Sequence, residues 1–110
     1  MGVAVIEREA RIVNPLGMHA RPAAEFVKVA TRFKSAIFLS RGALTVNGKS
    51  ILGVMMLAAE CGSSVHLKTD GDDAAEAMEA LLALVASGFH EMHLTGDETD
   101  DATDAQEGTA

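Results

Sequence analysis

The sequence has little of several things that would define a class of protein. It contains no Trp and no Tyr, so its apolar residues are aliphatic apart from four Phe and six Met. Cys61 is the single cysteine, which excludes an internal disulfide and a cysteine-based zinc site. No run of about 18 uncharged apolar residues occurs, and charges interrupt the apolar N-terminus. These absences predict a soluble, cytoplasmic protein with no membrane insertion.

The signatures of nucleotide and nucleic-acid binding are also missing. The chain has neither the G-x-x-x-x-G-K-[ST] phosphate loop nor the G-x-G-x-x-G fingerprint. It has no basic stripe with interleaved aromatics, so we expect no nucleic-acid partner. Its 110 residues suffice for one domain but leave little room for a closed active-site cleft. We therefore expect no nucleotide to bind by either of these two routes.

The net charge of −7 is concentrated at the C-terminus. Residues 97–110 carry six acids and no base, whereas residues 1–96 carry nine basic and ten acidic residues. A segment with so few apolar residues has almost nothing to bury. We therefore expect a folded domain over residues 1–96 and a disordered, solubilising acidic tail over residues 97–110.

The apolar pattern of the first 96 residues alternates between the period of strands and the period of helices. We expect, in order, a strand in VAVIEREARIV (3–13), a helix in ARPAAEFVKVATRFK (20–34), strands in SAIFLS (35–40) and ALTVN (43–47), a helix in SILGVMMLAAE (50–60), a strand in SVHLKT (64–69) and a helix over residues 73–88. Cys61 and Gly62 end the second helix in this interpretation. Asp73 with Glu76 is expected to form a capping box at the start of the third.

This order predicts a single sheet with helices packed on one face, an α+β domain. Local pattern does not determine the order of the strands. A ferredoxin-like or small ligand-binding regulatory domain would have a similar string of elements, so the fold by itself leaves the function open.

The stretch GMHARPA, residues 17–23, places several constraints on one turn. If a helix begins just after His19, the backbone N–H groups of Ala20 and Arg21 have no partner inside the helix, and the helix dipole adds positive charge there. Pro22 fits the first turn, and Gly17 permits a close backbone approach before it. Arg21 adds a donor fork suited to phosphate oxygens. The turn is therefore a candidate anion site.

His19 is the candidate nucleophile of this site. The positive end of the helix favours the neutral imidazole, which has a free lone pair. A neutral imidazole needs no neighbouring base to become a nucleophile, so the absence of an obvious partner residue is no objection to this role. A surface histidine near a helix cap explains the same residues, and the constellation alone leaves both interpretations open.

Two motifs resemble those of a known family. GMHARPAAEFVKVA is similar to the active-site signature of the histidine-containing phosphocarrier proteins of the bacterial phosphotransferase system, the HPr family. VNGKSILGVMML is similar to the second signature of that family, and the likeness extends over roughly residues 4 to 90. The resemblance implies an open-faced sandwich of four antiparallel strands and three helices, in the order βαββαβα.

The resemblance also implies roles for particular residues. His19 would accept a phosphoryl group on Nδ1 from enzyme I, itself charged by phosphoenolpyruvate, and pass the group to a IIA component. Arg21 would support the phosphohistidine, and an HPr kinase/phosphorylase would modify Ser50 with ATP. Ile51, Leu52 and Met55 would form an apolar patch on which partners dock. Such a chain is a carrier and not an autonomous enzyme, and we expect a monomer with no metal and no cofactor.

Two further questions stay open in the sequence. NPLGMH and SGFHE resemble the nitrogen-related branch of the family, whereas NGKSILGVMML resembles an HPr regulated by a kinase. Sugar transport and a regulatory phosphorelay therefore both fit. From another class, a regulatory module of the same fold that acts by docking alone would not need His19. His90 and His93 lack an identifiable third ligand, so we interpret them as surface residues.

Overall fold

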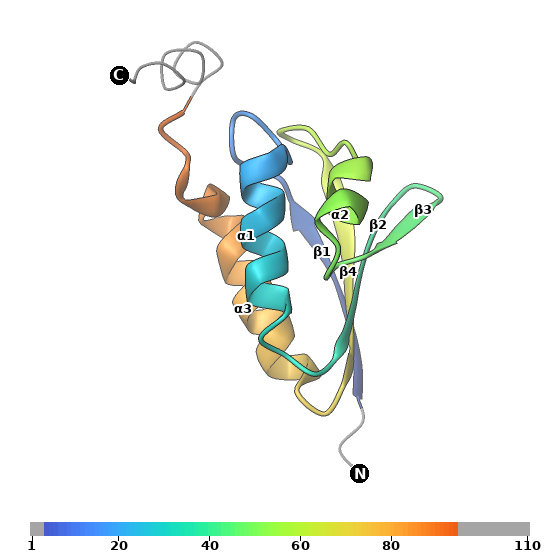
Figure 1. The fold of residues 1–110 in the computed structure, drawn as a ribbon. Helices are drawn as coiled ribbons and strands as arrows, with labels where there is room; N and C mark the ends of the chain where they lie inside the picture. The colour runs from blue at the N-terminus through green and yellow to red at the C-terminus, as the bar shows by residue number, and fades with distance from the viewer. Residues whose placement is uncertain (1–3, 95–110) are drawn as a thin grey trace.

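The computed structural model describes residues 4–94, which form a four-stranded antiparallel sheet with three helices on one of its faces (Figure 1). The strands are β1 (Ala4–Arg11), β2 (Ala36–Arg41), β3 (Leu44–Asn47) and β4 (Ser64–Gly71), and the helices are α1 (Ala20–Ala30), α2 (Ile51–Met56) and α3 (Ala74–Ala86). A short 3-10 turn, η1 (Gly88–His90), follows α3. This architecture confirms the predicted α+β open-faced sandwich. The acidic tail expected over residues 97–110 lies outside the described residues.

The strands lie in the order β1-β4-β2-β3, which the sequence pattern did not determine. The central strand β4 pairs antiparallel with β1 on one side and with β2 on the other, so that His66 lies opposite both Glu9 and Ser40. β1 and β3 are the outer strands. The last helix, α3, packs against the first strand, β1, and against its neighbour β4.

One face of the sheet forms the core with the helices. Alternate residues of the two inner strands are buried there, as the two-residue period predicts; these are Ile37, Leu39, Val65, Leu67 and Thr69. α1 contributes a buried stripe at helical spacing, made of Ala23, Phe26 and Ala30. The opposite face of the sheet carries polar residues such as Glu7, His66 and Lys68, and no helix of residues 4–94 covers it.

The second helix is shorter than expected, because it ends at Met56 and not near Cys61. The guanidinium of Arg41 donates to the carbonyl oxygens of Leu57 (3.1 Å) and Ala58 (2.6 Å). These bonds satisfy carbonyls that a longer helix would have paired internally. Ala58 has a φ of +50°, a left-handed conformation that turns the chain away from the helix axis. A long-range contact from β2 therefore overrides the local apolar pattern.

The predicted capping box at α3 is not formed. Asp73 occupies the N-cap position but makes no side-chain hydrogen bond to its own helix. Its carboxylate instead accepts from the backbone N–H of Lys34 (2.9 Å), the backbone N–H of Ser35 (2.9 Å) and the hydroxyl of Ser35 (2.5 Å). The hydroxyl of Ser35, followed by the backbone donors, lowers the pKa of Asp73 to about 2. Asp73 thus joins the start of α3 to the loop before β2.

Candidate functional site

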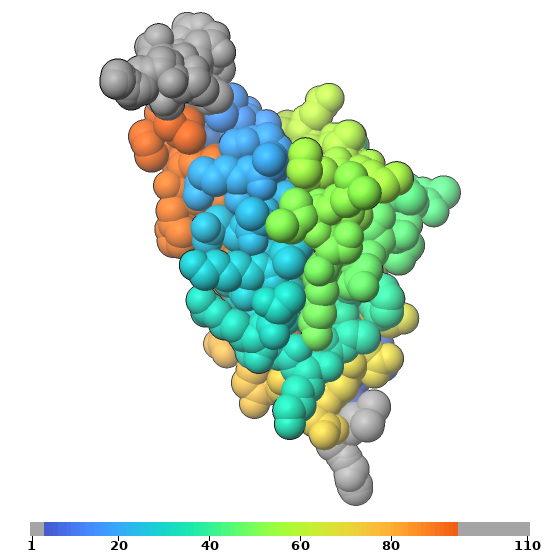
Figure 2. Space-filling model, in the orientation of Figure 1, coloured from blue at the N-terminus to red at the C-terminus, as the bar shows by residue number. Residues whose placement is uncertain are grey.

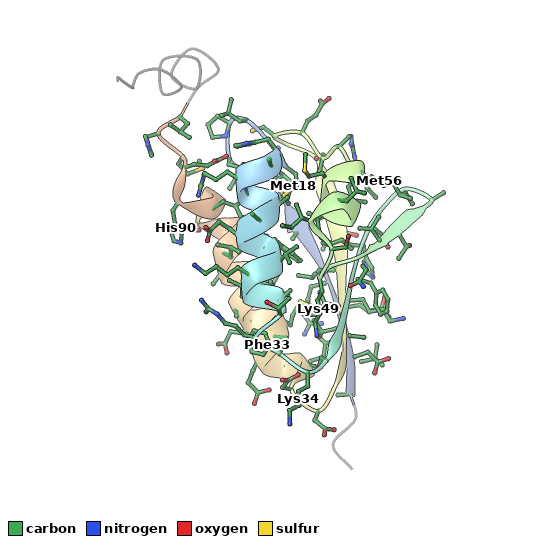
Figure 3. The ribbon with its side chains drawn as sticks, in the orientation of Figure 1. Met18, Phe33, Lys34, Lys49, Met56 and His90 are labelled. Carbon is green, nitrogen blue, oxygen red and sulfur yellow. The ribbon has the colours of Figure 1, made fainter. Side chains whose placement is uncertain are left out.

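His19 lies at the N-cap of α1, where a sharp turn brings the chain from β1 into the helix. Gly17 makes this turn possible: its φ is +70°, and a Cβ there would lie 2.7 Å from the carbonyl oxygen of Ala59. The N–H of Met18 donates to the same carbonyl at 2.8 Å. The start of α1 is therefore held against the segment that follows α2, and Figure 3 shows Met18 and Met56 near the same end of the molecule.

The first turn of α1 leaves backbone donors free. The first bond of the helix runs from the N–H of Ala23 to the carbonyl of His19 at 3.0 Å. Within residues 4–94, the N–H groups of Ala20 and Arg21 meet no backbone acceptor, and the His19 side chain does not cap the helix. Pro22 is buried in this turn and has no N–H to satisfy. The described site thus presents two unpaired donors beside His19, where an anion binds well.

A buried carboxylate that the sequence pattern did not indicate faces the imidazole of His19. Glu91 is only 1% exposed, and its two oxygens lie 3.0 Å and 3.1 Å from Nε2 of His19. Nε of Arg21 donates to the same carboxylate at 3.0 Å, and Nη2 of Arg21 donates to the carbonyl of Phe89. Nδ2 of Asn14 donates to Oε2 of Glu91 at 2.7 Å. Sequence reasoning missed both Glu91 and Asn14.

A strained turn delivers Glu91 to this position. After α3, Gly88 has a φ of +67°, and Phe89 and His90 follow with φ of +55° and +59°. Two successive residues other than glycine in the left-handed region are unfavourable, and such strain concentrates at functional sites. The side chain of Phe89 is fully buried and anchors the turn in the core. In the sequence, Gly88 was the only local signal for this turn. The neighbouring residues did not indicate that the turn would direct the side chain of Glu91 towards His19.

Burial alone would raise the pKa of Glu91, because it disfavours the charged carboxylate. The hydrogen bonds from Asn14, His19 and Arg21 favour the charged form and outweigh burial, so the pKa of Glu91 lies below its ordinary value. Glu91 is therefore an anion at neutral pH, with four short contacts to three donor groups.

The charge of Glu91 decides which ring nitrogen of His19 carries the proton. A carboxylate only accepts hydrogen bonds, so the ring nitrogen that faces it, Nε2, must carry the proton. In the neutral imidazole the lone pair is then on Nδ1, which has no hydrogen-bond partner among the described residues. The His19 side chain as a whole is 35% exposed.

The second motif forms an exposed apolar surface beside the first. Ser50 is the N-cap of α2, and its hydroxyl accepts from the N–H of Gly53 at 3.0 Å. The apolar side chains that follow are exposed: Ile51 by 45%, Leu52 by 70%, Met55 by 38% and Met56 by 59%. Figure 2 shows α2 next to α1 on one face of the molecule. Met56 belongs to this surface but was not among the predicted patch residues.

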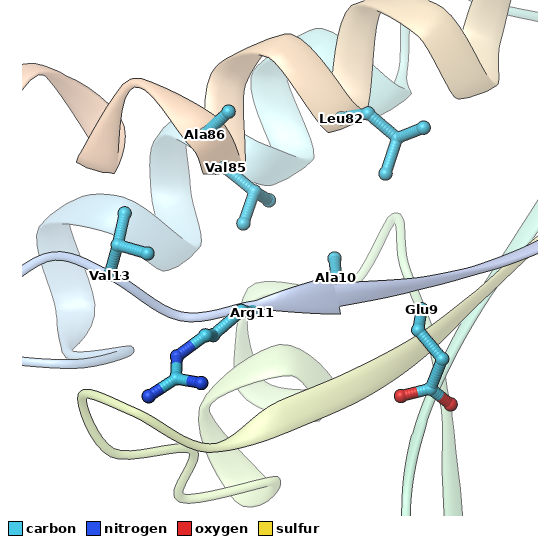
Figure 4. A pocket seen from close by; sticks show the side chains of 7 residues that line it. All are labelled: Glu9, Ala10, Arg11, Val13, Leu82, Val85 and Ala86. Carbon is cyan, nitrogen blue, oxygen red and sulfur yellow. The ribbon is translucent and has the colours of Figure 1, made fainter.

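The remaining candidates form no second site near His19. His90 and His93 are exposed, and no cluster of three or more potential metal ligands occurs in the described part of the chain. A hollow of about 340 Å³ between β1 and α3 is lined by residues such as Val13, Leu82 and Val85 (Figure 4). None of its lining residues belongs to the turn that carries His19. Over residues 4–94, no helix is long and apolar enough to cross a membrane.

Comparison with known proteins agrees with this geometry. Residues 6–87 match the family described as the PTS HPr component phosphorylation site. The chain is 51% identical over 87 residues to the phosphocarrier protein HPr of Cupriavidus necator, covering 79% of this chain and 98% of that one. Most of this chain therefore shares the sequence pattern of a phosphocarrier.

Solved structures agree as well. The HPr of Thermoanaerobacter tengcongensis matches with a TM-score of 0.75 at 44% identity, covering 78% of this chain and 97% of that one. The HPr of Bacillus anthracis matches with a TM-score of 0.72 at 45% identity, covering 74% and 98%. The chain belongs to the HPr family of the phosphotransferase system.

Proposed function

We propose that this phosphotransferase-system carrier accepts its phosphoryl group on Nδ1 of His19 and acts as a monomer in the cytoplasm. The observation that carries the proposal is the pairing of Nε2 with the buried Glu91, which leaves the Nδ1 lone pair available. The free N–H groups of Ala20 and Arg21 stand at the same helix start and can receive phosphate oxygens. A docking-only module of this fold would need neither arrangement.

The transfer step follows from this geometry. The Nδ1 lone pair forms the new N–P bond, while the bond between phosphorus and the donor atom of enzyme I breaks and its electron pair stays with enzyme I. The proton on Nε2 does not move, so the imidazole ring becomes cationic as the bond forms. The carboxylate of Glu91 stabilises that positive charge, as a buried acid does for the histidine of a catalytic triad. Transfer to a IIA component is the same step with the carrier as donor.

Arg21 supplies charge to the phosphorylated state. Its Nε and Nη2 are occupied by Glu91 and by the carbonyl of Phe89, whereas Nη1 has no partner among the described residues. The guanidinium is therefore already held at the site before the phosphoryl group arrives. A positive charge that is positioned in advance lowers the activation barrier of phosphoryl transfer more than one that must move into place. The side chain is 43% exposed, which leaves room for this contact.

As a carrier, the chain would act as a co-substrate of its partner proteins and would need an open surface on which they dock. His19 is open to solvent, and the exposed residues Ile51, Leu52, Met55 and Met56 lie on the helix beside it. Enzyme I and a IIA component would dock on this apolar surface, because its burial favours association. Which proteins the carrier exchanges phosphoryl groups with then depends on which proteins have a surface complementary to these exposed residues.

Ser50 is the proposed regulatory position, modified with ATP by an HPr kinase/phosphorylase. Its hydroxyl lies at the start of α2, where the N–H of Gly53 already points at it. A phosphate there would add about two negative charges directly beside Ile51 and Leu52. A partner that docks on these apolar residues would have to desolvate that charge, so docking weakens while the fold tolerates the modification.

The proposal is tested by incubating the chain with enzyme I and phosphoenolpyruvate and measuring its intact mass. We expect one phosphoryl group, stable in alkali and lost in acid, because a protonated imidazole is a good leaving group. His19→Ala should gain none, and His66→Ala, which alters a histidine on the opposite face of the sheet, should gain one. Full phosphorylation of His19→Ala would refute the assignment.

A further inference from the structure

A buried amide connects two distant parts of the site. Asn14 lies in the loop between β1 and α1 and is completely buried. Its Nδ2 donates to the carbonyl of Gly17 at 2.8 Å and to Oε2 of Glu91 at 2.7 Å, across 77 positions of sequence. Asn14 makes no hydrogen bond to His19 itself among the described residues. Any influence it has on the imidazole must therefore pass through Glu91 or the loop.

Asn14 is a costly residue to bury here. Its Oδ1 has no hydrogen-bond partner in the described part of the chain, and a buried acceptor without a donor opposes folding. An apolar residue of the same shape would avoid this cost. The amide is therefore better explained by what its Nδ2 holds than by stability.

The two bonds of Nδ2 fix both sides of the imidazole contact. The bond to Gly17 braces the tight turn that leads directly into His19. The bond to Glu91 orients the carboxylate, so that both of its oxygens face Nε2 of His19. Glu91 follows two strained residues, Phe89 and His90, so its side chain needs a restraint beyond its own backbone.

We propose that Asn14 is a positioning residue for phosphoryl transfer: it holds Glu91 against Nε2 of His19 and so keeps the lone pair on Nδ1. This inference rests on the proposed function of His19. It adds a residue outside the GMHARPA turn, in a position that contacts neither the phosphoryl group nor a partner. Removal of the partners that orient metal-bound histidines changes activity by about 10- to 100-fold, and we expect a loss of the same order for a group that orients His19 through Glu91.

The test uses Asn14→Leu, which keeps the branched shape but removes both donated bonds, and Asn14→Asp, which keeps the shape but replaces the amide donor with a carboxyl group that faces Glu91. Thr69→Val is the matched control, because Thr69 is also fully buried and donates to the carbonyl of Ala74 at 2.9 Å, away from the site. Each full-length protein is labelled with ¹⁵N in its histidines. The NMR spectrum then reports which ring nitrogen of His19 carries the proton.

We expect the wild type and Thr69→Val to hold the proton of His19 on Nε2, and both Asn14 variants to show a mixture of tautomers. The initial rate of phosphorylation by enzyme I should fall about tenfold or more in the Asn14 variants only. In a Glu91→Gln background, Asn14→Leu should have no further effect on the tautomer, because the group through which it acts has already changed.

Three results would overturn the inference. The first is an unchanged tautomer and rate in folded Asn14→Leu. The second is a loss of rate in Thr69→Val equal to that in the Asn14 variants. The third is that both Asn14 variants fail to fold although Thr69→Val folds. The second and third results would assign Asn14 a purely structural role. The tautomer measurement needs no phosphoryl transfer. A wild type that is not phosphorylated at all would therefore refute the proposed function separately.

Discussion

Glu91→Gln is the substitution that most sharply tests how the carboxylate prepares His19. Oε1 of Glu91 accepts from Nε2 of His19 and Nε of Arg21, while Oε2 accepts from Nε2 of His19 and Nδ2 of Asn14. Glutamine keeps the size of the side chain but replaces one acceptor oxygen by a donor NH₂. Whichever way this amide turns, its NH₂ faces the donor of Asn14 or of Arg21.

The expected loss follows from these contacts. At least one charge-assisted hydrogen bond disappears from a site that is 1% exposed, which costs about 1.5–3 kcal/mol of unfolding free energy. For a domain of this size each kcal/mol lowers the melting temperature by about 4–8 °C, so the drop should be roughly 6–24 °C. The rate of phosphorylation by enzyme I should fall about 10- to 100-fold, because Nε2 loses its anionic partner.

The effect of Glu91→Gln on stability should depend on pH. The pKa of Glu91 is lowered in the folded protein, so the stability it contributes is fully present above its ordinary pKa and is lost as the pH falls through the lowered value. The difference in melting temperature between the two proteins should therefore shrink in acid. Glu79→Gln, at an exposed position of α3, is the control. The reasoning fails if Glu91→Gln melts and accepts phosphate as Glu79→Gln does.

Three other substitutions give separate tests. Arg21→Ala removes one charge-assisted bond to the buried Glu91, so it should cost about 1.5–3 kcal/mol of stability and slow transfer more than tenfold; equal transfer rates would contradict this. Ser50→Asp should melt within a few degrees of wild type but accept phosphate from enzyme I more slowly, and unchanged kinetics would argue against regulation there. Ser35→Ala should raise the pKa of Asp73 from about 2 towards its ordinary value, as carboxyl NMR can measure. The stability that Asp73 contributes is present above its ordinary pKa and disappears as the pH falls through about 2. If the pKa of Asp73 does not change in Ser35→Ala, the hydroxyl of Ser35 is not the cause of the lowered pKa.

The elements of the fold could be predicted from sequence because each has a strong local pattern. The alternation of Val65 and Leu67 with His66 and Lys68 identified β4, and the helical spacing of Ala23, Phe26 and Ala30 identified α1. The length of α2 could not be predicted this way. Its end depends on Arg41, which comes from another strand and binds carbonyls that the apolar pattern would have left inside the helix.

The site divides in the same manner. His19, the free donors of the helix start and Arg21 lie within one turn, so local rules were enough to find them. Glu91 is 72 positions from His19, and only the packing of α3 and the left-handed turn after it bring the two together. A lone glutamate near the end of a chain has no periodicity to mark it. The carboxylate partner of His19 could therefore not be predicted from the spacing of residues in the sequence.

The central claim is that Glu91 holds Nε2 of His19 and leaves Nδ1 to carry the phosphoryl group. The most direct measurement is a long-range ¹H–¹⁵N NMR spectrum of the chain, labelled in its four histidines and phosphorylated with enzyme I and phosphoenolpyruvate. The account predicts that phosphorus is bonded to Nδ1 of His19 and that Nε2 still carries its proton. Phosphorus on Nε2 of His19, or on any other histidine, would contradict it.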